Sequence, residues 1–196
     1  MIGAGECQLE SWAARAKASG SPSAHGETAF VSCGVGGHHQ FGLLLDQARA
    51  DGATARAVTL FGKTTIVAPD KGKPGFGVSY TLGFEKLPGE GLRREAATVL
   101  GVATLEIAEG TIVHGNVGWA HSRSARQSTT NWSLGVEHGS DFTVAADVFG
   151  DDRERPWISA GVGYSLIDAL SVNAAYAVQF VTPRVRVLSV GLKFKF

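Results

Sequence analysis

The 196-residue sequence contains no run of 18 or more apolar residues, which excludes a membrane-spanning helix. Charged residues make up only 18% of the chain and their formal charges cancel, so no overall field favours nucleic acid. Only two cysteines are present, and no set of cysteines and histidines has the spacing of a zinc site. The length suits one domain, residues 1–196, and the sequence predicts no cofactor.

What the chain does have is a strongly alternating C-terminal strand. Apolar side chains occupy every second position, at Leu188, Val190, Leu192, Phe194 and Phe196. Successive strand side chains point to opposite faces, and soluble proteins avoid exposing a long apolar edge. The pattern is therefore typical of a strand with one face in lipid and the other in water. Phe194 and Phe196 resemble the C-terminal assembly signal of bacterial outer-membrane β-barrels, which implies recognition by the barrel-assembly machinery.

The same alternation recurs along the chain and predicts an all-β fold, a transmembrane antiparallel up-and-down β-barrel of about 12 strands. An even strand number suits a single-chain bacterial barrel. A soluble β-sandwich or soluble barrel is the weaker alternative, because the apolar faces are long, repeated and rich in terminal aromatics. The predicted strands lie near 5–17, 25–33, 39–49, 56–67, 75–86, 95–107, 111–121, 131–138, 141–149, 157–167, 170–180 and 186–196.

The predicted connections alternate between short and long, as periplasmic turns and outer loops do in such barrels. All six prolines fall in connections, where the missing N–H breaks no ladder bond. Guanidinium groups bind phosphate bidentately, so a rim of arginines would clamp outer-membrane lipids, lipopolysaccharide above all; the alternative is that loops are simply charged. With both termini in the periplasm, the arginines at the outer rim are Arg15, Arg49, Arg56, Arg93, Arg94, Arg123, Arg126, Arg153, Arg155, Arg184 and Arg186.

The two cysteines lie on the first two predicted strands. Cross-strand partners in an antiparallel hairpin have residue numbers with a constant sum, and Cys7 and Cys33 give 40, which centres the hairpin on Gly20. Both would lie near the periplasmic end, in an oxidising compartment. We therefore expect a disulfide that ties the first hairpin together, with two free thiols in apolar contacts as the alternative.

Polar residues on the face opposite the apolar one are candidates for a lumen that selects solutes. The alternative is that a narrow barrel fills itself with charge pairs and hydrogen bonds. Where the last strand meets the first, Lys193 and Lys195 should lie beside Glu6, Gln8 and Glu10, so we expect ion pairs at that seam. The lumen-facing candidates are Glu10, Asp46, Lys63, Glu85, Glu106, His114, Asn116, Glu137, Asp147, Asn173, Gln179, Lys193 and Lys195.

No enzyme or metal motif emerges from the sequence. The outer-membrane phospholipase barrel has a His-x-Ser pair on a strand, but the pair with that spacing here, His138 and Ser140, falls in a predicted turn. Adjacent His38 and His39 are weak evidence for a metal site. We predict neither catalytic residues nor a bound metal.

Several short segments resemble one family of barrels: 4–10, 114–119, 134–137 and 161–166. The family comprises outer-membrane transporters named after the meta-pathway of phenol degradation. This resemblance implies a passive facilitator in the outer membrane of Gram-negative bacteria for small, aromatic or hydrophobic solutes. Met1 precedes the family's opening segment directly, so we expect the secretory signal peptide to have been removed or to lie upstream.

The functional prediction is therefore a monomeric channel whose partners are a small-molecule solute and outer-membrane lipids, with no nucleic acid. A barrel that does not conduct and serves membrane structure or surface interaction is the runner-up. An outer-membrane lipid enzyme is a more distant third.

Overall fold

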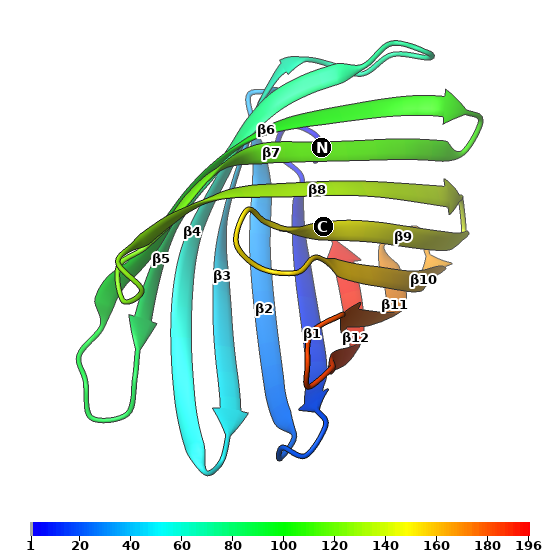
Figure 1. Ribbon diagram of the computed structural model, residues 1–196. Coiled ribbons are helices and arrows are strands. Elements are labelled where there is room, and N and C mark those ends of the chain that lie inside the picture. Colours follow the sequence, from blue (N-terminus) through cyan, green and yellow to red (C-terminus); the bar gives the residue numbers. More distant parts are fainter. Residues whose placement is uncertain (1) are drawn as a thin grey trace.

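Twelve antiparallel strands, each hydrogen-bonded to the next, form a closed sheet in the computed structural model, which describes residues 2–196 (Figure 1). Pairing of the first strand with the last completes the barrel, as predicted. The strands are β1 (Cys7–Ala18), β2 (Ala24–Val35), β3 (His39–Ala50), β4 (Ala53–Val67), β5 (Gly75–Lys86), β6 (Arg93–Ala108), β7 (Thr111–Ser122), β8 (Gln127–Gly139), β9 (Phe142–Asp151), β10 (Trp157–Ile167), β11 (Leu170–Gln179) and β12 (Val185–Lys195).

Within residues 2–196, no helix is long and apolar enough to cross a membrane.

The apolar side chains of the strands lie on the outer face of the barrel. Residues paired across an antiparallel ladder point to the same face, so a face can be followed from strand to strand. One such row around half of the barrel consists of apolar residues alone: Leu170, Phe194, Leu9, Val31, Leu43, Leu60 and Leu82. Leu9 and Leu60 are about half exposed, at 44% and 50%. The row one residue away, on the inner face, holds Lys193, Glu10 and Phe30.

Among residues 2–196, no hydrophobic residue is buried, whereas four polar residues are: Gln8, Ser32, Gln40 and Gln179. A soluble domain buries its apolar side chains and leaves polar ones outside. The reverse arrangement fits a barrel whose outer face meets hydrocarbon. Tyr80 and Leu192, which the alternation predicts on the lipid-facing side, are among the exposed outer residues.

The two ends of the barrel differ. We call the end that holds Cys7 and Phe196 the near rim, because both ends of the described chain lie there; the backbone N–H of Cys7 donates to the carbonyl oxygen of Phe196 at 2.8 Å. The far rim carries the loops 19–23, 87–92, 123–126, 152–156 and 180–184. All six prolines lie outside the strands, as expected.

The strand bounds differ from the predicted ones at the far rim. The predicted loop 122–130 shrinks to 123–126, because β7 and β8 stay paired as far as Ser122 and Gln127. Between β3 and β4 only Asp51 and Gly52 remain, both with positive φ. Alternation of apolar and polar residues marks the part of a strand that faces lipid, whereas backbone pairing continues into polar sequence beyond it.

Cys7 and Cys33 are paired in the β1–β2 ladder and joined by a disulfide, the arrangement expected from the sequence. They belong to the outer face at the near rim, two residues along from Leu9 and Val31. The bond closes a loop of 26 residues that contains the whole first hairpin.

Candidate functional site

The lumen of the barrel gathers the polar residues. All 13 lumen-facing candidates lie on the inner face when the ladders are followed around the barrel. Asp46, for instance, follows Leu44, which pairs with the inward Phe30. The hydrogen bond between Thr28 Oγ1 and Asp46 Oδ1, at 2.6 Å, joins two inner residues of β2 and β3.

At the seam between β12 and β1, the ion pair expected for Lys193 is present, whereas among the described residues Lys195 forms none. Lys193 pairs with Glu10 in the ladder, and their Nζ and Oε1 atoms are 3.6 Å apart. The Gln8 amide donates to the same carboxylate at 2.5 Å, and Gln8 itself pairs with Lys195. The Glu10 side chain is 15% exposed, so it is the more enclosed partner. Polar contacts among Lys193, Glu10 and Gln8 thus line the seam on the inner face.

The near-rim mouth is narrowed by the segment that precedes β1. Residues 2–6 turn inward and run across the inner face of β2, where Ala4 bridges Gly34 in parallel fashion. The N–H of Gly5 donates to the Gly34 carbonyl at 3.0 Å, and the N–H of Gly34 donates to the Glu6 carbonyl at 2.9 Å. A Cβ atom on Gly34 would lie 2.1 Å from the Gly3 carbonyl oxygen, so only glycine permits this close approach.

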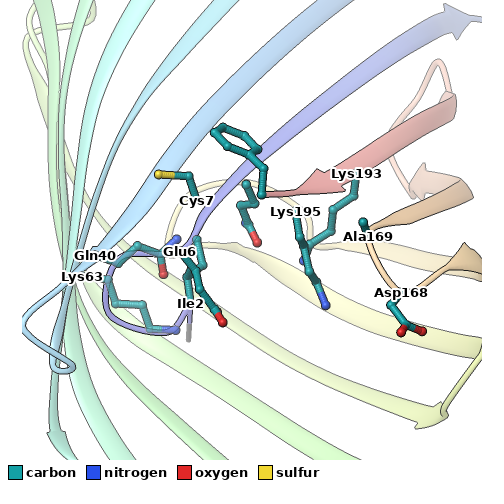
Figure 2. A pocket seen from close by; sticks show the side chains of 11 residues that line it. Ile2, Glu6, Cys7, Gln40, Lys63, Asp168, Ala169, Lys193 and Lys195 are labelled. Carbon is teal, nitrogen blue, oxygen red and sulfur yellow. The ribbon is translucent and has the colours of Figure 1, made fainter.

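Beside this segment lies a cavity of about 640 Å³ that opens to solvent. Ile2, Glu6, Gln40 and Lys63 cluster on one side of it in Figure 2, and Lys193, Lys195 and Asp168 lie on the other. The buried Gln40 donates to the Ser32 hydroxyl at 3.0 Å. The cavity is therefore a polar mouth in which three lysines face shared space.

The opposite wall, on β6 to β8, is polar and open. Nε2 of His114 lies 3.6 Å from Oε1 of Glu137, and its Nδ1 lies 3.1 Å from the Thr104 hydroxyl. Asn116 donates to the Ser133 hydroxyl at 2.7 Å. The His114 and Glu137 side chains are 40% and 43% exposed, so they remain accessible to solvent despite these contacts.

The remaining candidates are spread along the lumen. Asp147 accepts a hydrogen bond from Ser159 at 2.9 Å, and Gln179 donates to the Arg155 carbonyl at 2.8 Å. Glu85, Glu106 and Asn173 pair in their ladders with Arg93, Ile112 and Gly191, respectively. The structure thus makes two local groups of the candidates, at the seam and on β7–β8, and does not bring the whole set together.

The polar pattern missed an apolar part of the lumen, formed by Phe30 and Phe61, which we call the aromatic patch. The rings of Phe30 and Phe61 meet edge to face, with centroids 5.5 Å apart, across the intervening strand β3. They do so over Gly42, where a Cβ atom would lie 2.8 Å from Phe30 Cε2. The available signal was that each ring follows or precedes an outward apolar residue, Phe30 beside Val31 and Phe61 beside Leu60, which places an apolar residue on each face.

Of the weaker candidates, Ser140 lies in the predicted turn, whereas His138 lies in a strand. It is the last residue but one of β8 at the near rim, where its Nδ1 lies 2.8 Å from the Thr111 hydroxyl. His39 contacts the Thr64 hydroxyl at 3.0 Å. Among residues 2–196, no group of three or more His, Cys, Asp or Glu side chains is placed to hold a metal ion.

Comparison with known proteins bears on the family and on the fold. The model of a family described as uncharacterised conserved protein UCP029691 matches residues 2–196. The chain belongs to this family. The family description says nothing of phenol degradation, and no curated protein matches the sequence.

Members of outer-membrane protein families share the fold of this UCP029691-family barrel. The NanC porin matches with a TM-score of 0.72 at 12% identity, covering 96% of this chain and all of that one. The KdgM porin in complex with oligogalacturonate gives 0.69 at 10% identity, covering 96% and 99%. Outer membrane phospholipase A from Escherichia coli gives 0.64 at 8% identity, covering 95% and 89%. The fold is therefore that of outer-membrane porins and related barrels.

Proposed function

We propose that the protein is a passive channel in the bacterial outer membrane. The main observation behind this proposal concerns the lumen. Its polar groups form local hydrogen bonds yet remain accessible to solvent, and His114 and Glu137, for example, are 40% and 43% exposed. A barrel that filled itself with side chains would bury these groups. The porin fold and the apolar outer face support this location.

The near rim then faces the periplasm. Termini and short turns lie on the periplasmic side of such barrels, and longer loops lie outside. The disulfide at this rim is consistent with an oxidising compartment. The resemblance to transporters named after phenol degradation is in keeping with this direction of passage, since such solutes enter from outside.

We propose further that amphipathic aromatic solutes, aromatic acids above all, are favoured. Phe30 and Phe61 offer ring faces and edges to the lumen, and such ring contacts contribute roughly 0.5–1.5 kcal/mol each. Lys63 follows Phe61 on the same inner face and supplies a cation for a carboxylate. An aromatic acid would thus meet ring contacts and a positive charge side by side.

The runner-up is a barrel that does not conduct, and one observation favours it. The segment 2–6 and the buried Gln40 and Ser32 occupy part of the near-rim mouth, beside a cavity of about 640 Å³. A lipid enzyme has less support, because Ser140 lies in a turn beyond the end of β8 and no acid contacts His138 among the hydrogen bonds of the described chain. We infer that the protein is no enzyme.

Planar-bilayer conductance and liposome swelling with benzoate and arabinose test both proposals. We expect discrete conductance steps, and benzoate entering faster than a neutral sugar of similar size. Replacing Phe30 and Phe61 by serine should slow benzoate about threefold relative to arabinose. A matched control replaces Leu100 and Val102, inner apolar residues of β6, by serine. Absence of steps refutes the channel, whereas steps with equal benzoate loss in both variants refute the aromatic preference alone.

A further inference from the structure

The outer face of the barrel is strongly asymmetric in charge. On β7 to β11, the outward side chains include no lysine, arginine, aspartate or glutamate among the described residues. On β12 and β1 to β5, six cations point outward near the far rim. We call this set the cationic arc: Lys17, Arg15, Arg49, Arg56, Lys86 and Arg186.

The ladders place these cations in adjacent rows. Arg15 pairs with His25, which pairs with Arg49, so the two guanidinium groups project from strands separated by one intervening strand. With about 4.8 Å between neighbouring strands, their backbones are roughly 10 Å apart. Lys17 pairs with Arg186, and Arg56 pairs with Lys86. The arc is therefore continuous across the strands from β12 to β5.

Little within the protein neutralises the arc. Glu27 is the outward acid on these strands near the far rim, and it receives a hydrogen bond from Gln47, which in turn accepts one from Arg56. Arg15 donates to the Ser23 hydroxyl at 3.1 Å. Among the described residues, none of the six cations forms an ion pair.

The apolar surface directly below matches an amphiphile. Two to four residues toward the near rim on the same strands lie Leu188, Leu45 and Leu60, all about half exposed. A ligand with acyl chains against these leucines would carry its head group at the height of the arc. Guanidinium groups bind phosphate bidentately, so the matching head group is phosphorylated.

We propose that the cationic arc binds a phosphorylated glycolipid of the outer leaflet, lipopolysaccharide, on the β12–β5 side of the barrel and not on the β7–β11 side. The inference rests on the outer-membrane location within the proposed function and is independent of conduction. The loop arginines Arg123, Arg126 and Arg153 differ from the arc in that they lie beyond the strand ends, outside the ladders that form the outer face.

Two variants with equal loss of charge at the far rim separate these cases. The arc variant is Arg15→Gln/Arg49→Gln/Arg56→Gln, and the loop variant is Arg123→Gln/Arg126→Gln/Arg153→Gln. Each full chain is isolated in detergent, checked for β-structure by circular dichroism, and titrated with fluorescent lipopolysaccharide. We expect the arc variant to bind at least about tenfold more weakly, since each surface cation contributes favourably toward an anionic lipid, and the loop variant to stay within about twofold of wild type.

Two further titrations identify the recognised group. Dephosphorylated lipopolysaccharide should bind wild type about as weakly as phosphorylated lipopolysaccharide binds the arc variant. Inorganic phosphate alone should not compete at matched phosphate concentration. Equal affinities of the arc and loop variants would overturn the proposal, as would full affinity for the dephosphorylated lipid or effective competition by free phosphate. Arg15→Lys/Arg49→Lys/Arg56→Lys, which keeps the charge, should retain part of the binding.

Discussion

The two halves of the barrel are built differently, although the same ladder runs through both. The half formed by β12 and β1 to β5 holds the disulfide, the inward segment 2–6, the aromatic patch and the cationic arc. The half formed by β7 to β11 has an uncharged outer face. On its inner face stand Glu137 and Asp147, with no lysine or arginine among its described strand residues.

The difference suggests a division of tasks. One half carries the features that fix the chain ends and those for which we propose contacts with solutes and lipid head groups. The other half closes the wall, and Glu137 and Asp147 stand on its inner face. The lysines of the lumen, Lys63, Lys193 and Lys195, all belong to the first half, where the acids Glu10, Asp46 and Glu85 also lie. The second half has acids but, among its described strand residues, no lysine or arginine on its inner face. Three substitutions test how real this division is.

The largest expected effect concerns the disulfide, which ties only the first half. Replacing Cys7 and Cys33 by serine removes a link across 26 residues, and loop-closure entropy assigns such a link about 3 kcal/mol. We expect the free energy of unfolding to fall by up to that amount, measured by urea titration in lipid vesicles. Wild type treated with reductant should behave as the variant does.

If the variant and the reduced wild type both match the oxidised protein, the first hairpin gains its stability from pairing alone. That result would remove the main energetic difference between the halves. A loss in the serine variant without a loss on reduction would point instead to the polar serine side chains on the outer face near Leu9 and Val31.

Much of this architecture can be predicted from the sequence, because each strand of a membrane barrel alternates between residues that face lipid and residues that face the lumen. The strand number, the outward residues such as Tyr80, and the facing of Cys7 and Cys33 all follow from period-two alternation and a constant ladder sum. The inner candidates follow from the same parity. Alternation does not predict where strands end, because the ladder between β7 and β8 continues through polar residues beyond the lipid-facing part.

The parts that sequence missed depend on contacts between strands that are not neighbours. Phe30 and Phe61 meet across β3, and nothing in either local sequence indicates the partner. The inward course of residues 2–6 depends on one missing side chain, at Gly34, among 26 glycines. Asymmetry of the outer charges likewise appears only when the register joins Arg15, His25 and Arg49 in one row.

A smaller effect is expected at the seam within the first half, where the first and last strands of the chain pair. Glu10→Gln leaves Lys193 without its partner at a carboxylate that is 15% exposed, and we expect unfolding free energy to fall by about 1 kcal/mol. The control is Lys73→Gln, which breaks the pair with Asp70 in the turn between β4 and β5. Both of those side chains are at least 70% exposed, so this change should cost nothing measurable. Equal losses would show that the seam pair has no special role.

The smallest expected effect concerns ion preference and bears most directly on the division of charge inside. Lys193→Gln/Lys195→Gln removes cations from one wall, and Glu137→Gln/Asp147→Asn removes acids from the other. Charges within about a Debye length of the passing ion act on it, so each variant should move the potassium-to-chloride permeability ratio by roughly threefold, in opposite directions. Reversal potentials across a salt gradient measure the ratio. An ion that passes between the two walls is affected by the charges of both. If the permeability ratio moves in the same direction in both variants, or does not move, ions do not pass between these walls.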